Sequence, residues 1–380
     1  MTTALGNAAL HCVRITGKTC WSFLRLHTPD GGTGEGEATL SGQDDALLAA
    51  AERLVPKALL EATLENPGGF AAGHAPGDIY EASIVSALDQ ALWDLHGRAH
   101  GHSLAQSLGI RRRPIPVYAN INRRTVERSP EAFAASARAA SAAGHVAFKL
   151  APFDEVTREV CAAGNGGRAM QAGLARIAAV REAVGPDVRL MVDCHWRFDE
   201  ATAVVLNEAA AKLGVYWIEC PLPEVEGSIP ALTRLRRQCE MLGMRQAGLE
   251  QSIGWEVIRP YCEAGAYDVV MPDVKYIGGV HELRKVSSAC ADLGVEVSPH
   301  NPSGPVSHAF SLQVSATLAA FDRLEMQFDE SPLFDALVGA PFGPIVDGHA
   351  ALPSGSGLGV ALSGALLEKH AERAVREWRG

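Results

Sequence analysis

The chain lacks several features that define large classes of proteins. Its 380 residues carry 34 Lys and Arg against 44 Asp and Glu, and this net charge of −10 argues against binding to nucleic acid or to an anionic membrane surface. No apolar run approaches the ~18 residues that a membrane-spanning helix needs. The N-terminal stretch MTTALGNAALHCVRITG lacks the basic head and apolar run of a signal peptide, so we expect a cytoplasmic protein.

Two motifs built on cysteine and glycine are also absent. The eight cysteines are scattered and never form C-x-x-C, which argues against a zinc ribbon or a redox pair and favours reduced thiols. No G-x-G-x-x-G follows a predicted strand, so nothing supports a dinucleotide-binding sheet. What the chain does have, 47% hydrophobic and 21% charged residues, is the composition of a globular protein.

Residues 1–113 show an α+β pattern, with strands first and helices after them. We predict, in order, strands over 10–15 and 20–26 around a turn at Gly17-Lys18, a helix over 43–64, a Gly/Pro loop over 66–77, and a long helix over 78–108 with Asp78 as its N-cap. At the other end of the chain the pattern predicts a final helix over 361–379.

Residues 114–349 alternate short apolar runs with segments of helical period, which is typical of parallel strands in βα units. The eight runs are PVYAN, HVAFKL, VRLMVD, VYWIE, QAGLE, DVVMPD, VEVSPH and RLEMQF. Eight such units favour an α/β fold with a closed β/α barrel of the TIM type. A doubly wound open sheet is the alternative fold.

A polar residue stands at or just after the end of nearly every predicted barrel strand, where barrel active sites lie. These residues are Lys149, Asp193 with His195, Glu219, Glu250, Asp273 with Lys275, His300 and Glu325. From Asp193 onward they follow one another by about the length of one strand–helix unit. We therefore expect their side chains to meet at one end of the barrel.

Three of these residues, Asp193, Glu219 and Glu250, are carboxylates on successive strands. Without a cation they would repel one another and raise each other's pKa. An all-oxygen set of ligands suits Mg²⁺ better than zinc, so we predict a Mg²⁺ site here. Any one of them alone would be read as an ordinary solvated or paired acid.

The two histidines at the strand ends suggest acid–base chemistry. Asp273 can fix the tautomer of His300 and make its other nitrogen a better base. His195 follows Asp193 by two residues, so in a strand it would point the same way. It could act as a general acid, donate a hydrogen bond to substrate, or orient a ligand.

The lysines leave more than one role open. Lys149 would point into the barrel mouth beside the carboxylates, as a catalytic group or as a counter-charge. Lys275 would share a face with Asp273 and either bind a substrate anion or pair with Asp273 or Glu250. Lys275 and Asn301 are the predicted substrate-binding residues.

At these residues the chain resembles the enolase superfamily, in particular its mandelate racemase-like subgroup. The matching pieces are MVDCHW at 191–196, WIECPLP at 217–223, AGLEQ at 247–251, MPDVKYIGG at 271–279, SPH at 298–300 and PSGSGLG at 353–359. The N-terminal WSFLRL and GEGE pieces fit the capping domain of that family. The resemblance implies that residues 1–113, completed by 350–380, form a capping domain over the barrel, and that the protein is a homo-oligomer.

The resemblance also implies residue roles. Asp193, Glu219 and Glu250 become Mg²⁺ ligands, and His300 with Asp273 becomes the base that removes the proton α to a carboxylate. Glu325 becomes the acid that hydrogen-bonds the substrate carboxylate. Lys149 matches the first lysine of the family's Lys-x-Lys. Sites of this superfamily combine a Lys or His base with Mg²⁺, which stabilises the enediolate that proton removal leaves.

The chain departs from the subgroup at Ala151, where the second lysine would stand. That lysine is the usual base on the face opposite the histidine, so a racemase with two bases is harder to build. Asp193-x-His195 instead resembles acid-sugar dehydratases of the subgroup. We therefore expect a dehydratase that converts an aldonate or aldarate into a 2-keto-3-deoxy acid. A cycloisomerase or an epimerase is the alternative, and the long segment around 153–173 is a candidate for shaping substrate choice.

Overall fold

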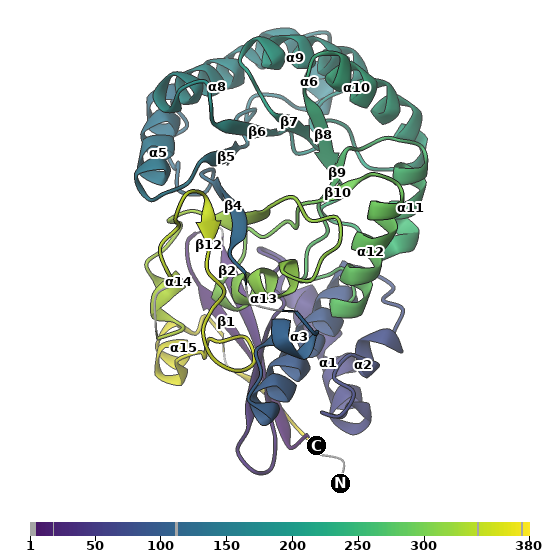
Figure 1. The fold of residues 1–380 in the computed structure, drawn as a ribbon, viewed down its shortest axis with the longest axis vertical. Helices are drawn as coiled ribbons and strands as arrows, with labels where there is room; N and C mark the ends of the chain where they lie inside the picture. The colour runs from purple at the N-terminus through teal and green to yellow at the C-terminus, as the bar shows by residue number, and fades with distance from the viewer. Residues whose placement is uncertain (1–4, 18, 111–112, 340–341, 374) are drawn as a thin grey trace.

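The larger domain is built on eight parallel strands (Figure 1). The computed structural model describes residues 5–17, 19–110, 113–339, 342–373 and 375–380. The barrel strands, hydrogen-bonded in the order β10-β9-β8-β7-β6-β5-β4-β11, are β4 (Ile115–Asn120), β5 (Ala147–Leu150), β6 (Arg189–Asp193), β7 (Trp217–Glu219), β8 (Arg245–Gly248), β9 (Val269–Val270), β10 (Glu296–Val297) and β11 (Leu324–Gln327). A parallel bridge joins Val297 of β10 to Phe321, just before β11, and Glu325 N of β11 donates to the carbonyl of Pro299 after β10, so the sheet closes and the predicted barrel is confirmed.

Helices surround the barrel strands on the outside (Figure 1). They are α5 (Pro130–Ala142), α8 (Gln171–Val184), α9 (Glu200–Lys212), α10 (Ile229–Met241), α11 (Trp255–Glu263), α12 (Val280–Asp292) and α13 (Pro305–Ser315). Shorter elements fill the connections, namely α6 (Arg158–Ala162), α7 (Gly166–Ala169), the 3-10 turn η1 (Glu226–Ser228), α14 (Leu333–Ala336) and β12 (His349–Ala350), which pairs antiparallel with β4. The predicted insertion after β5 therefore contains α6 and α7.

Inside the barrel, a layer of apolar side chains lies directly below the charged side chains at the strand ends. Ala147, Met191 and Trp217 belong to one buried cluster inside the barrel. Each lies two residues before a charged residue of the same strand, Lys149, Asp193 or Glu219 in turn. Because side chains two apart in a strand share a face, the apolar layer supports the charged one.

The smaller domain, which we call the capping domain, has a four-stranded antiparallel sheet in the order β13-β1-β2-β3. Its strands are β1 (Asn7–Arg14), β2 (Cys20–His27), β3 (Thr33–Glu37) and β13 (Arg376–Arg379). Its helices are α1 (Asp44–Glu61), α2 (Gly69–Ala72), α3 (Ile79–His100) and α4 (Leu104–Ser107), and α15 (Gly364–His370) leads toward β13. No helix in the described parts of the chain is long and apolar enough to cross a membrane.

Two predicted helices are wrong in extent. The long helix over 78–108 begins as expected, with Asp78 accepting hydrogen bonds from the first-turn amides, but it ends at His100. Gly101 takes a left-handed conformation with φ 68°, and Ser103 then starts α4 with a capping box. The predicted final helix over 361–379 is only α15, because the last residues pair with β1 as strand β13.

Most other predicted elements of the capping domain are present. The strands over 10–15 and 20–26 and the helix over 43–64 are found as β1, β2 and α1. Lys18 of the predicted turn lies outside the described residues. The domain boundaries stay a prediction, although β13 lies at the edge of the capping sheet, as a completing C-terminal segment would.

Strand β3 packs directly against helix α3 because it has no side chains at two positions. A Cβ atom at Gly34 or Gly36 would overlap the carbonyl oxygen of Ala91 or Ala87. This close approach buries Glu37, whose carboxylate accepts hydrogen bonds from Gly304 N at 2.7 Å and Ser307 N at 2.9 Å. The capping domain thereby holds the start of α13, which follows the loop that carries His300.

We predict that Gly36→Ala lowers the free energy of unfolding by about 3 kcal/mol, because the new methyl group forces β3 away from α3. Chemical denaturation followed by circular dichroism measures this change. Gly167→Ala is the matched control, since a Cβ there meets no atom within 4 Å. Equal stability of Gly36→Ala and the unmodified protein would mean that β3 does not depend on this close packing.

Candidate active site

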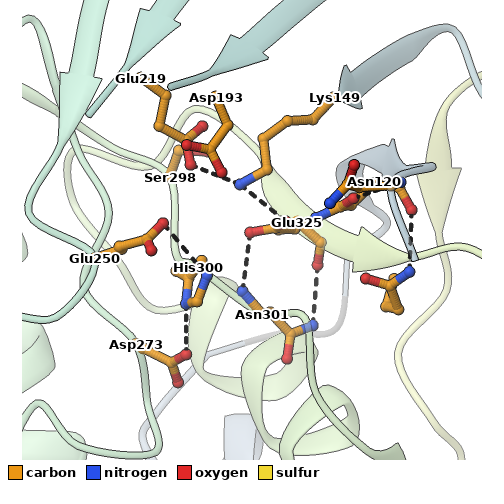
Figure 2. Close-up of polar contacts among 12 residues, drawn as sticks. Asn120, Lys149, Asp193, Glu219, Glu250, Asp273, Ser298, His300, Asn301 and Glu325 are labelled. Carbon is orange, nitrogen blue, oxygen red and sulfur yellow. Dashed lines mark hydrogen bonds and ion pairs between the residues drawn. The ribbon is translucent and has the colours of Figure 1, made fainter. Parts of the chain in front are cut away.

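Asp193, Glu219 and Glu250 come together at the end of the barrel (Figure 2). Asp193 and Glu219 are the last residues of β6 and β7 and are register partners, and Glu250 follows β8 by two residues. One oxygen atom from each of the three carboxylates lies within 4.8 Å of the others, and all three side chains are buried. The predicted cluster therefore exists.

The pKa values of the three acids indicate that the cluster lacks positive charge. Burial and the neighbouring charges of Asp193 and Glu325 raise the pKa of Glu219 to about 7, although Lys149 opposes this. Burial together with Asp193 and Glu219 holds the pKa of Glu250 well above its usual range. Burial opposes ionisation of Asp193 too, but His195 and Lys149 outweigh it and lower that pKa to about 2. Two of the three acids thus resist ionisation in the absence of further positive charge.

The donor set fits a hard divalent cation. The Oε2 atom of Glu250 is buried, accepts no hydrogen bond from the described residues, and lies 3.4 Å from His300 Nε2. Three convergent carboxylate oxygens match the ligand preference of Mg²⁺, which usually completes its shell with water and substrate oxygens. The residues present therefore fit the group that the sequence predicts.

Lys149 is the ammonium group beside this cluster. Its Nζ atom lies 2.7 Å from Glu219 Oε1 and 2.9 Å from Glu325 Oε1 (Figure 2). Burial opposes its charge, but Glu219 and Glu325 outweigh that effect and hold the pKa of Lys149 well above its ordinary value. Lys149 therefore stays protonated and balances the buried acids.

Glu325 is fixed from several sides. Its Oε1 atom accepts a hydrogen bond of 2.6 Å from Asn120 Nδ2, and its Oε2 atom accepts one of 3.2 Å from the backbone amide of Asn301. The side-chain amide of Asn301 donates to the carbonyl of Glu325 and lies 2.9 Å from His308 Nδ1. Asn301, predicted to bind substrate, is thus buried and holds Glu325 through both its backbone and its side chain.

Asp273 and His300 form the predicted pair. His300 Nδ1 lies 2.8 Å from Asp273 Oδ2 (Figure 2), and Tyr276 Oη lies 3.3 Å from the same nitrogen. Burial lowers the pKa of His300, partly offset by Asp273, while Lys275 and His300 outweigh burial and lower the pKa of Asp273 to about 2. An ionised Asp273 makes Nδ1 the protonated nitrogen, so Nε2 carries the free lone pair on the side of Glu250.

Lys275 takes one of the roles left open for it. Its Nζ atom forms an ion pair of 2.5 Å with Asp273 Oδ2 and a hydrogen bond to Ser303 Oγ. Its backbone amide donates to Asp273 Oδ1 at 2.8 Å. The side chain also lines a cavity beside His300, so its position is compatible with contact to a bound anion.

His195 lies beside the cluster, but not because it continues a strand. β6 ends at Asp193, and His195 has a left-handed backbone with φ 48°. The turn brings His195 Nε2 to 2.7 Å from Asp193 Oδ2, while its backbone amide donates to Asp193 Oδ1 at 2.8 Å. Asp193 raises the pKa of His195, and burial opposes this.

Two adjoining cavities lie between the capping domain and the barrel mouth. The larger, about 760 Å³, is lined by His195, and the smaller, about 370 Å³, by His300 and Lys275. Ser41 and Arg123 line both. The two imidazoles therefore line neighbouring cavities, and the capping domain supplies part of the walls.

Glu224 is a partly buried site residue that sequence reasoning missed. Three turns carry the metal-ligand candidates, and each contains non-glycine residues with positive φ, namely His195 and Trp196 after β6, Cys220 after β7 and Leu249 after β8. Glu224 accepts hydrogen bonds from Trp196 Nε1 at 3.0 Å, from Leu249 N at 2.6 Å and from Cys220 Sγ at 3.8 Å. One carboxylate thus ties together all three turns, a role that no spacing in the sequence indicates.

The predicted insertion packs beside the site. Arg197 Nη1 donates to the carbonyls of Phe153, Asp154 and Val156, at 3.1 to 3.3 Å. Asp154 and Arg197 both line the larger cavity, as does Ala151. The segment after β5 is therefore tied to the turn after β6 and contributes to the cavity wall.

A cap-and-barrel fold with three carboxylates and an Asp–His pair at the strand ends defines a class of barrel proteins with a divalent-metal site. The "Enolase C-terminal domain-like" family model matches residues 132–366, and the "Mandelate racemase / muconate lactonizing enzyme, N-terminal domain" model matches residues 8–109. The chain belongs to the enolase superfamily, in its mandelate racemase-like subgroup.

Known proteins similar to the chain include three curated relatives. A D-gluconate dehydratase of Thermoproteus tenax is 35% identical over 76% of this chain, and the match spans 56% of that relative's own length. A D-galactarolactone cycloisomerase of Agrobacterium fabrum is 30% identical over 74% of this chain and 72% of its own. A D-galactonate dehydratase of Verminephrobacter eiseniae is 28% identical over 94% of this chain and 96% of its own.

The fold also matches solved structures along nearly its whole length. A mandelate racemase/muconate lactonizing enzyme from Sulfitobacter superposes with a TM-score of 0.83 at 22% identity, covering 98% of this chain and 96% of that one. This likeness supports the cap-and-barrel architecture.

We predict that Glu219→Gln weakens binding of Mg²⁺ by 10-fold or more, because it removes one anionic ligand while keeping the shape of the side chain. Isothermal titration calorimetry with MgCl₂ measures the effect. Glu200→Gln, an acid on the exposed start of α9 that pairs with Arg234, is the control and should bind Mg²⁺ unchanged. Unaltered Mg²⁺ affinity in Glu219→Gln would refute the assignment of this ligand.

We predict that Glu224→Gln weakens Mg²⁺ binding by about 10- to 100-fold without touching a ligand, since outer groups that orient ligands have effects of this size. The same calorimetry measures it, with circular dichroism to confirm folding. Tyr267→Phe is the control, because Tyr267 donates to Glu224 at 2.8 Å but belongs to none of the three turns. If both variants weaken binding equally, Glu224 acts through general packing.

Proposed function

We propose that the protein is a Mg²⁺-dependent dehydratase of a sugar acid, an aldonate or an aldarate, and produces a 2-keto-3-deoxy acid. One observation carries the proposal. Two imidazoles adjoin the carboxylate cluster, and each contacts a different aspartate, His300 with Asp273 and His195 with Asp193. An elimination needs a base and an acid in one site, and these two groups can supply them.

His300 is the proposed base. Its Nδ1 atom is held by Asp273, and its Nε2 atom is on the side of the metal-ligand candidate Glu250. Because burial keeps this imidazole neutral at neutral pH, Nε2 can accept the proton on the carbon next to the substrate carboxylate. Asp273 then stabilises the imidazolium that forms.

Removal of that proton leaves negative charge on the substrate, which must be stabilised. Asp193, Glu219 and Glu250 would hold Mg²⁺, and the bound ion supplies positive charge beside the substrate carboxylate. Lys149 adds a second, permanent positive charge close by. A buried ammonium group stabilises such charge more strongly than an exposed one, because little water screens it.

His195 is the proposed acid. It lines the larger cavity, and Asp193 favours its protonated form. The electron pair left by the departing proton forms the new C2–C3 double bond, and the C3–O bond breaks. His195 donates its proton to the leaving hydroxyl, which departs as water, and the enol product rearranges to the 2-keto acid.

The residues that line the larger cavity support the proposal of a polyhydroxylated substrate. Side chains that can exchange hydrogen bonds with hydroxyl groups gather there, namely Thr16, Thr19, Ser41, Asn122, Arg123 and Thr125. The relatives named as dehydratases of gluconate and galactonate support the same class of substrate. We also propose that the protein is cytoplasmic, as the sequence suggests, and a homo-oligomer, as the resemblance to the family implies.

A cycloisomerase or an epimerase is the second candidate, and the relative named as a D-galactarolactone cycloisomerase favours it. Such a reaction could share His300 and the metal site. A two-base epimerase finds less support, because Ala151 replaces the second lysine and Lys149 is held protonated between Glu219 and Glu325.

We predict that His195→Asn lowers the rate of dehydration by about 10²- to 10⁴-fold while exchange of the α-proton with solvent continues, because only the acid is lost. Proton NMR in D₂O with MgCl₂ and pooled aldonates and aldarates follows both the 3-deoxy methylene signal and loss of the α-proton signal. His300→Asn should lose both reactions and still bind Mg²⁺.

The NMR experiment separates the candidates. A 3-deoxy product from the unmodified protein, lost in His195→Asn, supports the dehydratase. Loss of the α-proton signal without a 3-deoxy product, unchanged in His195→Asn, supports the isomerase or epimerase instead. No change in any of the acids would exclude these sugar acids as substrates.

A further inference from the structure

A second cluster of possible metal ligands lies in the capping domain, away from the barrel mouth. Cys12 is on β1, Cys20 is the first residue of β2, and Asp44 is the first residue of α1. Their two sulfur atoms and one carboxylate oxygen all lie within 4.8 Å of one another. Cys12 is opposite Ser22 in the antiparallel pair, so strand pairing brings it near Cys20, and no C-x-x-C spacing is needed.

Asp44 provides an independent sign that the cluster lacks an occupant. The residue is only 9% exposed, and its Oδ1 atom is buried without a hydrogen-bond partner among the described residues. A buried carboxylate oxygen without a donor is unfavourable unless a cation satisfies it. The two thiols beside it can, as thiolates, bind a thiophilic metal ion such as zinc.

The C-terminal segment runs beside the cluster, where the backbone amide of Glu372 donates to the carbonyl of Cys12 at 2.9 Å. Two thiolates and one carboxylate supply three of the four positions of a tetrahedral zinc site, and water can fill the fourth. The three ligand candidates come from β1, β2 and α1, so a bound ion would connect these segments.

The surroundings suit an ion with anionic ligands. Arg14 pairs with Glu372, and Arg373 lies close enough to interact with both Asp44 and Cys12. These guanidinium groups would offset part of the negative charge that three anionic ligands leave on a divalent ion.

We propose that Cys12, Cys20 and Asp44 bind a structural Zn²⁺ ion in the capping domain. Thiolate ligands select a softer ion than the all-oxygen cluster at the barrel mouth, so the two sites differ in metal. The inference is independent of the proposed dehydratase activity, because none of the three residues lines the cavities that contain His195 and His300.

The chain contains its own control for this proposal. Cys262 and Cys290, on the packed helices α11 and α12, are a second pair of buried cysteines that interact with each other. Among the described residues this pair does not form a three-ligand cluster with any carboxylate or imidazole. Cys290→Ser therefore tests the effect of losing a thiol from a pair that we expect not to bind zinc.

The experiment uses the full-length protein, reduced and freed of metal, then loaded with ZnCl₂ or CoCl₂ and dialysed. We expect the unmodified protein, Cys290→Ser and Glu219→Gln to retain about one tightly bound zinc per chain, and Cys12→Ser and Asp44→Asn to retain at least 10-fold less. The Co²⁺ form should show a thiolate-to-metal charge-transfer band that Cys12→Ser lacks. Zn²⁺ should raise the melting temperature of the unmodified protein and not that of Cys12→Ser.

Three results would overturn the proposal. The first is equal zinc retention by the unmodified protein and Cys12→Ser, and the second is a Co²⁺ form without a thiolate band. The third is an intact mass lower by two hydrogens with Cys12 and Cys20 resistant to thiol labelling, which would mean that the pair is a disulfide. The Co²⁺ and melting measurements on the unmodified protein decide the matter even if a cysteine variant does not fold.

Discussion

The repulsion among four buried carboxylates dominates the centre of this molecule. Asp193, Glu219, Glu250 and Glu325 converge at the ends of the barrel strands, and Lys149 is the ammonium group that contacts two of them. Much of the surrounding structure supplies positive charge or hydrogen-bond donors to this region, including His195, Asn120 and the amide of Asn301. A divalent cation is the kind of group that could supply the further positive charge that this centre lacks.

Buried acids that accept hydrogen bonds from backbone amides also join the two domains. Glu37 of β3 accepts hydrogen bonds at the start of α13, and Asp89 of α3 accepts one of 2.8 Å from Val280 N at the start of α12. Asp94 of α3 accepts one of 2.8 Å from Leu358 N in the C-terminal segment. Since helix starts offer unpaired amides and a favourable dipole, Glu37 and Asp89 dock the capping domain onto the barrel, while Asp94 ties α3 to the C-terminal segment.

The sequence predicted the barrel and the carboxylate cluster well, because both follow from local regularity. Each strand run ends in a polar residue at a repeating interval, and parallel strands place such residues at one edge. The position of His195 was anticipated for the wrong reason, since a left-handed turn and not a strand directs it toward Asp193. Glu224 could not be anticipated, because its partners lie on three turns that only the folded barrel brings together. β13 was mistaken for helix because its pairing with β1 is a contact between distant parts of the chain.

The pairing of β13 with β1 has a consequence for the order of assembly during synthesis. β1 precedes every barrel strand in the chain and β13 follows all of them, yet the two strands pair along Asn7–Leu10 and Arg376–Arg379. As translation proceeds from the N-terminus, the edge of β1 must wait, unpaired, until the whole barrel has emerged from the ribosome. The barrel can therefore form while the capping sheet is still one strand short, and the edge of that sheet is completed last. A nascent chain would have its carboxylate cluster assembled before its capping sheet is complete.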